Sequence, residues 1–595
     1  MTGSTITATV TSGVTLGSGS YPNPLTVTST GDIAPTGDGA VGLFADVASG
    51  YVLNQGTIAG GADTVSVGPT DVVGLGVYLG TGSLTNEGTI YGGAGEVAAA
   101  QASSGIYMTD GSLTNTGAII GGAGEGYPPP ETADSGTLLR LPPGNGGAGV
   151  VAFGGSLTNV GTITGGAGGS PGVGGGAGGD GVDLFGGSLT NTGTIVGGVG
   201  GAGGFGVALM YGGTLINTGF IGEGDSEGVV LGWGDAIYFG TAASRLVLGT
   251  EASLNGGIIA SGTVGNVLEL ASGSGVGTIS HLTGNVPDVV TEQDGITGFS
   301  TIQFDSGATW LVAGDTLGLA AGQTIDGFAY GDTIEVTGVT VAGSSYAGGV
   351  LTLDDTAGSV DLNLSGNFIT SDLVVTNNAS GAEITPAAAV PCFAAGTRIA
   401  TERGAVAVEH LDVGDVVLTV SGGKQAIQWI GHRRMDCRRH MDPTLIWPIR
   451  ISPHAFGQGR PERALLLSPG HAVFVENVLI PIQLLINDRT IRQIRVDDVS
   501  YYHIELPRHD IVLAEGLPAE SYLETGGRAA FANSGVVLDL HPDFVADLKR
   551  VAMVWACFGY APLTGGGEHL VRARRKLHWQ ATMLDAEHQV SQAAP

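Results

Sequence analysis

Apolar positions recur in three short runs within each repeat of the first part of the chain. The most regular copies begin GSLTN at Gly82, Gly111, Gly155 and Gly187, and each is followed by GTIxGG or a close variant. A third run, such as GVYL from Gly76, precedes each copy. Within each run, apolar residues alternate with small or polar ones. This alternation predicts strands with one buried face.

One asparagine recurs at a fixed place in every copy, 26 to 44 residues after the previous one: Asn54, Asn86, Asn115, Asn159, Asn191 and Asn217. Glycines between the runs permit bends, and a single repeat cannot bury its own apolar face, so the copies must stack. We therefore predict an all-β fold, a right-handed parallel β-helix with about 30 residues per turn. The recurring asparagine suggests a corner or a ladder of stacked amides.

The predicted β-helix extends beyond the clearest repeats, which cover about 40–240. Alternation persists from 245 to 385, where we expect further turns and a cap. The Ala- and Pro-containing stretch NNASGAEITPAAAVP (377–391) reads as an exposed connection. The predicted organisation is a β-helix over 1–385 and a linker over 386–391.

Charge separates two modules at Cys392. Before it lie 32 acidic and two basic residues, Arg140 and Arg245, a net charge of −30. From Cys392 onward there are 21 basic and 22 acidic residues. The acidic module argues against nucleic acid and anionic membranes as partners, and favours an extracellular surface. We find no apolar stretch long enough for a transmembrane helix and no classical signal peptide, and we expect secretion or surface display by a non-classical or C-terminally signalled route.

The acidic module offers little catalytic or metal-binding chemistry. Residues 175–183, GGAGGDGVD, match a calcium-binding nonapeptide, but such sites use tandem copies, so we predict no metal. A carbohydrate-active enzyme needs paired carboxylates or a base with cationic helpers, and the only histidine here is His281. We favour a binding role. The repeats resemble passenger regions of autotransporter-like adhesins, which implies a cell-surface or polysaccharide ligand.

Three ordered blocks follow the charge boundary. They are AVPCFAAGTRIATERGAVAVEHLDVGDVVLTVSGG (389–423), LLLSPGHAVFV (465–475) and VSYYHIELPRHDIVLAEGLPAES (499–521). Together they resemble the Hint (hedgehog/intein) autoprocessing domains found at the ends of secreted alphaproteobacterial proteins. The resemblance spans 392–531 and implies a Hint-type β domain there.

The resemblance implies chemistry at the Pro391–Cys392 bond. The Cys392 thiol attacks the preceding carbonyl and converts the amide into a thioester, an N-to-S acyl shift assisted by intramolecular proximity. The family's second-block roles fall on His471, which polarises the amide and protonates its nitrogen, and on Ser468, which orients the scissile carbonyl. His509 is expected near the same centre, and His503 is a weaker candidate.

The remaining cysteines and the last block limit which reactions the domain is expected to perform. Cys437 and Cys557 are expected to be ordinary thiols, because the spacing of the three cysteines gives neither a disulfide framework nor a zinc pattern. Splicing inteins end with a His-Asn pair before a nucleophile, and this chain has none. We therefore expect cleavage by water or a small nucleophile, or transfer to a surface amine, without splicing and without a cofactor.

A helical extension is predicted over 532–595. Apolar spacing and strong helix formers favour one helix at 541–558 and a basic one at 567–588. The chain as a whole is expected to be a secreted or surface β-helix protein, adhesin-like or matrix-forming, with a self-cleaving Hint domain. Two alternatives stay open: a structural protein with an inactive Hint cap, and a carbohydrate-active β-helix enzyme.

Overall fold

The protein, analysed as a computed structural model, divides into two units. We call Met1–Ala271, Gly277–Asp305 and Val312–Asp326 the β-helix unit, and Ser272–Val276, Ser306–Leu311 and Gly327–Pro595 the C-terminal unit. The described residues are 3–62, 74–95, 102–126, 131–132, 138–139, 143–169, 175–225, 235–260, 265–273, 275–283, 295–305, 307–329, 331–355, 358–366, 368, 373–386, 391–438, 446–524, 528, 531–533, 554–555, 557–564 and 567–593.

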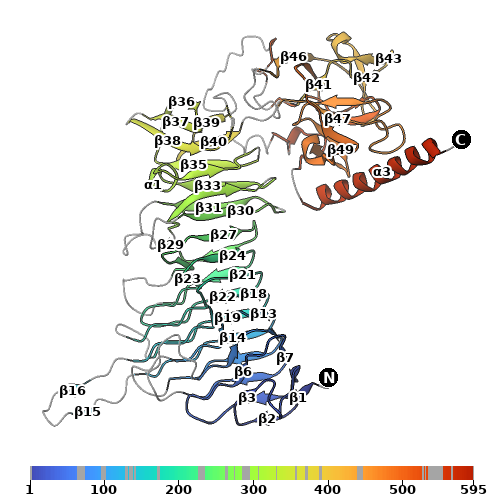
Figure 1. Cartoon of the computed structure of the whole chain (residues 1–595). Coiled ribbons are helices and arrows are strands. Elements are labelled where there is room, and N and C mark those ends of the chain that lie inside the picture. The colour runs from blue at the N-terminus through green and yellow to red at the C-terminus, as the bar shows by residue number, and fades with distance from the viewer. Residues whose placement is uncertain are drawn as a thin grey trace. The chain divides into compact units, whose positions relative to one another are not determined.

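Three parallel sheets run along the β-helix unit (Figure 1). Each of the first nine turns contributes one strand to each sheet, and the later turns extend only the first of these sheets. The first sheet contains β1 (Ser4–Ile6), β4 (Leu25–Val27), β7 (Tyr51–Asn54), β10 (Ser83–Asn86), β13 (Ser112–Asn115), β18 (Ser156–Asn159), β21 (Ser188–Asn191), β24 (Gly213–Asn217), β27 (Ser244–Leu248), β30 (Asn266–Leu270), β32 (Phe299–Phe304) and β34 (Thr324–Asp326).

The second sheet contains β2 (Thr9–Val10), β5 (Asp32–Ile33), β8 (Thr57–Ala59), β11 (Thr89–Tyr91), β14 (Ala118–Ile120), β19 (Thr162–Thr164), β22 (Thr194–Val196), β25 (Phe220–Gly222) and β28 (Ser253–Asn255). The third contains β3 (Val14–Thr15), β6 (Leu43–Ala45), β9 (Val77–Leu79), β12 (Ile106–Met108), β17 (Val150–Ala152), β20 (Val182–Leu184), β23 (Val207–Leu209), β26 (Ile237–Phe239) and β29 (Ile258–Ala260). The predicted parallel β-helix, with three strands per turn, is confirmed.

Equivalent residues of successive repeats stack inside the coil. Leu84 pairs in register with Leu113, and Leu113 with Leu157, and all three are buried. The asparagines form a second internal row, in which the Nδ2 atom of Asn86 donates to Oδ1 of Asn115 at 2.8 Å. The same bond, at 2.7–2.8 Å, joins the other neighbours of the row from Asn54 to Asn217. The ladder of stacked amides is therefore present.

Other segments complete the described part of the solenoid region. They include the antiparallel pair β15 (Glu131–Thr132) and β16 (Leu138–Leu139) and the short helix α1 (Thr316–Leu319). A separate five-stranded sheet has the order β31 (Gly277–Leu282), β33 (Trp310–Gly314), β35 (Thr333–Thr337), β40 (Gly381–Pro386) and β39 (Leu373–Asn377). The antiparallel strands β38 (Gly358–Leu364), β37 (Val350–Asp355) and β36 (Val341–Ala347) extend the first sheet beyond β34. The stretch 377–391 thus differs from the expected exposed connection. Its residues Ala382 and Ile384 are buried, so β40 pairs with β39 and β35.

The C-terminal β domain consists of two mainly antiparallel sheets. One has the order β46 (Trp429–Asp436), β52 (Asp498–Glu505), β41 (Phe393–Ala394), β48 (Leu465–Leu467), β47 (Ile449–Ile451) and β51 (Ile491–Gln493). The other has the order β45 (Lys424–Ala426), β44 (Val416–Leu418), β42 (Arg398–Thr401), β53 (Ile511–Ala514), β54 (Leu517–Glu520), β49 (Ala472–Val475) and β50 (Val478–Pro481), with β43 (Gly404–Ala407) on β42.

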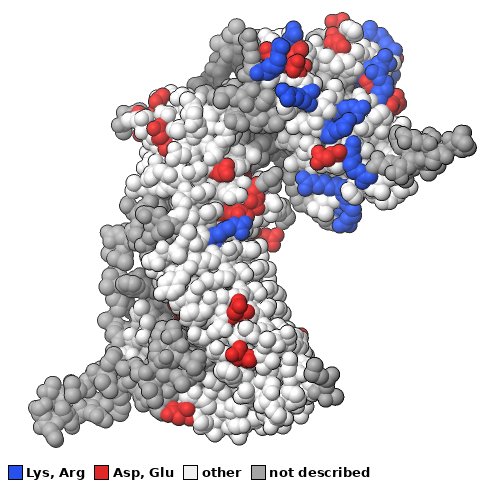
Figure 2. All heavy atoms as spheres, viewed as in Figure 1, with Lys and Arg blue, Asp and Glu red and all other residues white. Residues whose placement is uncertain are grey.

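The helix α3 (Gly567–Ala593) confirms the second predicted tail helix. It buries Leu570, Ala573 and Leu577 in the apolar core of the C-terminal β domain. The first predicted tail helix, 541–558, falls mostly outside the described residues. No described helix is long and apolar enough to cross a membrane. On the face drawn in Figure 2, Lys and Arg gather on the C-terminal β domain and are sparse on the β-helix unit.

Candidate active site

Cys392 directly precedes the two-residue strand β41, which lies between two longer strands. In β41, Phe393 pairs with Leu467 of β48 on one side and with Tyr502 of β52 on the other. Antiparallel register therefore brings Cys392 beside Ser468 and His503. The thiol is fully buried. The first residue of the domain is thus held within its main sheet.

Ser468 holds the backbone of Cys392 by two hydrogen bonds. The N–H of Cys392 donates to Oγ of Ser468 at 2.7 Å, and the N–H of Ser468 donates to the carbonyl oxygen of Cys392 at 3.0 Å. The nitrogen in this contact is that of the Pro391–Cys392 bond. The sequence-based expectation put Ser468 on the scissile carbonyl instead. Because Cys392 and Ser468 are cross-strand neighbours, the hydroxyl meets the N–H.

His471 belongs to the tight turn that Ser468 begins. Its N–H donates to the carbonyl oxygen of Ser468 at 3.1 Å, and its buried ring lies 4.2 Å, centroid to centroid, from Phe393. Burial lowers the pKa of His471 to about 3, and backbone groups of Cys392 and Glu520 partly oppose this. Neither ring nitrogen has a hydrogen bond of normal geometry to a described residue. The imidazole is therefore neutral near pH 7.

The two later histidines lie in different surroundings. The ring of His503 is buried, with its centroid 5.1 Å from that of His471, and burial followed by the charges of His471 and His509 lowers its pKa well below the usual range. His509 instead accepts a hydrogen bond on Nδ1 from the N–H of Tyr560 at 2.9 Å and faces Trp555 edge-on. Burial lowers the pKa of His509 to about 4. The structure thus places His503, the weaker candidate, beside Cys392, whereas His509 is hydrogen-bonded to Tyr560 of the C-terminal tail.

Glu520 is a buried acid that the sequence analysis did not single out. It ends β54, and its Oε1 accepts a hydrogen bond from the N–H of Ala472 at 2.6 Å, directly after His471. Burial raises the pKa of Glu520 to about 8, which leaves the carboxyl protonated near neutral pH. A sequence signal was available: an acidic residue closes a strand whose other end, Leu517, is apolar and buried.

The thiol of Cys392 is protonated in this environment. Burial raises its pKa to about 12, the Arg433 guanidinium lowers it in part, and a charge on Glu520 would raise it further. Tyr501, in the same apolar cluster, donates its hydroxyl hydrogen to the carbonyl oxygen of Ile446 at 2.7 Å. Cys437 also belongs to this cluster, and both thiols are free.

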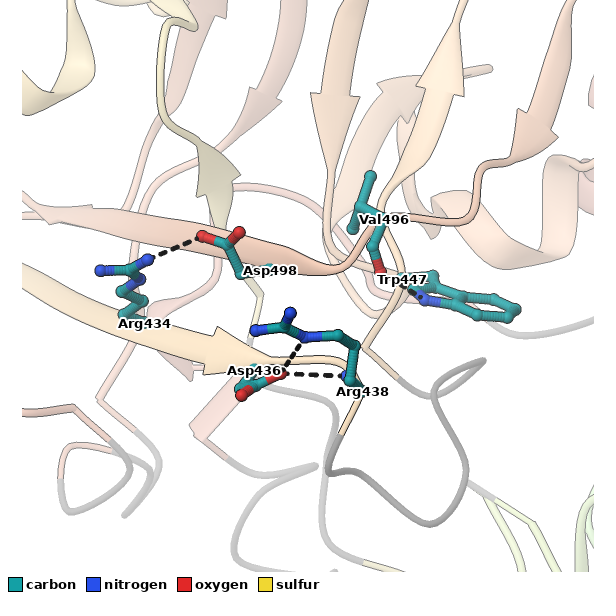
Figure 3. Close-up of polar contacts among 6 residues, drawn as sticks. All are labelled: Arg434, Asp436, Arg438, Trp447, Val496 and Asp498. Carbon is teal, nitrogen blue, oxygen red and sulfur yellow. Dashed lines mark hydrogen bonds and ion pairs between the residues drawn. The ribbon is translucent and has the colours of Figure 1, made fainter.

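The strand pair behind Cys392 is held in register at its outer end. In β46 and β52, Asp436 lies directly opposite Asp498, and the arginines Arg434 and Arg438 bond to these carboxylates at 3.1 and 3.2 Å (Figure 3). Both pairs are exposed, so solvent screening leaves each of them only a small contribution to stability. A slip of one residue would turn His503 to the other face of the sheet, so the register matters for the site.

The sequence of this domain decides its family. The family model of the Hint domain matches residues 391–526. Residues 391–526 form a Hint domain. The assignment covers the site built around Cys392, and it makes the C-terminal part of the chain a self-processing type of domain.

Two solved structures are similar to the Hint domain. A bacterial intein-like domain from Clostridium thermocellum is 14% identical, with 22% of this chain and 98% of that chain covered and a TM-score of 0.17. A crystal structure of the gp41-1 intein is 14% identical, with 22% and 97% covered and a TM-score of 0.16. No functionally curated protein matches the chain.

Proposed function

We propose that the Hint domain cleaves the chain at the Pro391–Cys392 bond through a thioester. The main support is the 2.7 Å hydrogen bond from the N–H of this peptide bond to Oγ of Ser468. The thiol of Cys392, the residue that supplies this N–H, is buried. The bond holds the peptide nitrogen in place, and the thiol needs only to reach the adjoining carbonyl carbon. Such intramolecular geometry gives a high effective concentration.

The reaction begins when Sγ of Cys392 attacks the carbonyl carbon of Pro391. A C–S bond forms, the C–N bond breaks, and the thiol proton ends on the departing nitrogen, which becomes an amine. Water then attacks the thioester carbon, giving a carboxylate on Pro391 and restoring the thiol. A small nucleophile or a surface amine would take the place of water in a transfer reaction.

Proton movement limits the first step. Burial raises the pKa of the Cys392 thiol and lowers that of the His471 imidazolium, so full proton transfer from Cys392 to His471 is strongly disfavoured. A neutral imidazole avoids this cost by accepting the thiol proton on one nitrogen while giving a proton from the other to the leaving nitrogen. We assign that relay to His471, and expect a slow reaction that accelerates when the site opens.

The thioester is tested on the purified chain. Wild type, Cys392→Ala and the control Cys437→Ala are incubated with and without dithiothreitol or hydroxylamine and separated on a denaturing gel. We expect fragments 1–391 and 392–595 from wild type and Cys437→Ala, faster with either nucleophile, and no fragments from Cys392→Ala. An intact wild-type chain under all conditions would refute the proposal and favour a structural cap.

We also propose that the β-helix unit is the secreted or surface-displayed part, adhesin-like or matrix-forming. Its support is the acidic, repetitive solenoid, which offers one continuous surface and few cationic groups. Fractionation of expressing cells checks the location. Recovery of the chain and both fragments only from the cytoplasm would refute this part.

A further inference from the structure

Arg433 lies on the same face of its sheet as Cys392. In β46 it stands directly opposite Tyr501 of β52, and Tyr501 stands directly opposite Ala394 of β41. Residues directly opposite each other share a face, and so do residues two apart in an extended segment, such as Ala394 and Cys392. Cys392, Ala394 and Tyr501 also belong to one buried cluster. The side chain of Arg433 therefore lies on the side of the sheet that carries the thiol.

Arg433 has a buried donor without a partner, unlike the two arginines that follow it. Arg434 is bound to Asp498 and Arg438 to Asp436, and both pairs are exposed (Figure 3). Nε of Arg433 is instead inaccessible to solvent and has no hydrogen-bond partner among the described residues. Burying a polar atom without a partner costs free energy, so its placement needs a reason.

The other ionisable groups around the thiol carry no charge near pH 7. They come from the elements packed around Cys392: Tyr501 and His503 of β52, His471 of the turn after β48, Glu520 at the end of β54, Tyr522 after it, and Cys437 after β46. Burial lowers the pKa of the two imidazoles and raises the pKa of the acidic groups. Among the described residues, Arg433 is the one cation whose charge lowers the pKa of the thiol.

The proposed attack builds negative charge inside this cluster. The charge passes from Sγ of Cys392 to the carbonyl oxygen of Pro391 as the C–S bond forms, while the proton moves through His471 to the leaving nitrogen. A fixed cation stabilises such charge more strongly in a site that excludes water than in water. We propose that Arg433 supplies the positive charge that stabilises this anion and so speeds the first step. This role presupposes the proposed thioester route, and Arg433 itself transfers no proton.

Cleavage rates of the full-length chain test this role in Arg433→Met, Arg433→Lys and the control Arg434→Met. Arg434 is the next residue of the same strand, and its side chain is 76% exposed and paired with Asp498. We expect Arg433→Met to cleave at least about tenfold more slowly than wild type at neutral pH. Arg433→Lys keeps the charge, so it and Arg434→Met should stay within about threefold of wild type. Equal rates of Arg433→Met and wild type would overturn the proposal.

Alkylation of the thiol separates this test from the test of cleavage itself. Iodoacetamide reacts with the thiolate, and mass spectrometry gives its rate at Cys392 relative to Cys437, which reports the opening of the same buried cluster. We expect Arg433→Met to lower this ratio at least about tenfold. A lowered ratio in a chain that never cleaves would uphold the stabilisation of the anion by Arg433 and refute cleavage alone. An unchanged ratio in a chain that cleaves would refute the role of Arg433 alone.

Circular dichroism shows whether the variants fold, and Arg433→Gln is a second neutral variant with the same expected losses. If both neutral variants misfold, Arg433→Lys decides the question. A lysine loses its charge above about pH 10, whereas an arginine keeps it. The alkylation ratio of Arg433→Lys should therefore fall behind that of wild type from about pH 9 to about pH 11. Parallel ratios over this range would contradict the proposal.

Discussion

The groups around Cys392 are neutral near pH 7 although they are ionisable. The thiol has a pKa of about 12, His471 of about 3 and Glu520 of about 8. Burying charged forms would cost several kcal/mol each, and the neutral forms avoid this. The same neutrality keeps the thiol a weak nucleophile. The neutral forms thus favour the folded domain and disfavour attack by the thiol for the same electrostatic reason.

The contact between Ser468 and the peptide nitrogen of Cys392 predicts an effect on the rate of the proposed cleavage. Ser468→Ala leaves the N–H of Cys392 without its acceptor, so we expect cleavage to slow about 10- to 100-fold, while Ser468→Thr keeps most of the rate. First-order rates from gel densitometry measure this. Ser452→Ala, which removes a half-buried hydroxyl elsewhere, is the control. An unchanged rate in Ser468→Ala would contradict the assignment.

Glu520 predicts a pH-dependent stability. Its pKa rises from 4.5 to about 8 on folding, so the folded domain retains a proton that the unfolded chain releases. The stability is fully present below about pH 4.5 and is lost as the pH rises to about 8. Glu520→Gln keeps an acceptor for Ala472 and removes the titration.

We therefore expect Glu520→Gln to match wild type at pH 4 and to exceed it by about 3 to 5 kcal/mol at pH 8. Urea unfolding of the Hint domain at both pH values checks this. Glu402→Gln, an exposed carboxylate paired with Lys424, should change little at either pH. Equal pH dependence in wild type and Glu520→Gln would show that Glu520 ionises normally.

The sequence predicted those parts of the site whose residues lie together in one short sequence block. Ser468 and His471 share one turn, and the pairing of two conspicuous strands brings that turn to Cys392. Glu520 was not predictable, because its burial depends on β54 pairing with β49. His509 was expected near the same centre; its charge lowers the pKa of His503, and its Nδ1 accepts a hydrogen bond from Tyr560 of the tail. A sequence motif does not show which residues from distant parts of the chain contact its side chains.

At the scale of elements, the β-helix is stabilised by rows of identical residues. Each central amide of the asparagine ladder accepts from the turn before and donates to the turn after. All of these side chains are fully buried, so an unpaired member would cost the desolvation of its polar atoms. This explains why the same position holds asparagine in six successive repeats while the loops between the strands vary in length.

Interrupting the ladder predicts a local loss of stability. Asn159→Ala leaves the Oδ1 of Asn191 and the Nδ2 of Asn115 without one partner each, so we expect destabilisation of about 2 to 4 kcal/mol. Thr158→Ala, on the outer side of the same strand, should cost less than about 0.5 kcal/mol. Urea unfolding followed by far-ultraviolet circular dichroism compares them. Equal losses of stability in both variants would contradict a specific contribution of the asparagine ladder.

The elements themselves were predictable where the period was short and repeated. The three runs per turn became three strands because each repeat offers the same alternation. The stretch containing β40 was misjudged, because alanine and proline masked the alternation of Ala382 and Ile384. Its burial comes from two antiparallel partners, β35 and β39, and one of them is over forty residues earlier.

At the scale of the whole chain, composition and contacts divide the molecule at different places. The charge changes at Cys392, whereas contact density separates the units after Asp326. The strands β35 to β40 are therefore acidic like the β-helix but belong to the C-terminal unit. The net charge depends on solvent-facing side chains, whereas the contacts depend on the core. The charge boundary and the boundary between the units therefore need not coincide. Two units with separate cores predict two unfolding transitions.

The tail helix α3 distinguishes these transitions. Leu577 is 2% exposed and packs into the core of the Hint domain, whereas Trp579, two residues on, is 61% exposed. Leu577→Ala should cost about 2 to 5 kcal/mol and lower only the transition of the C-terminal unit. Trp579→Ala should leave both transitions in place. Scanning calorimetry on a Cys392→Ala background measures them without cleavage. A single transition that shifts as a whole would mean that the two cores unfold as one cooperative body.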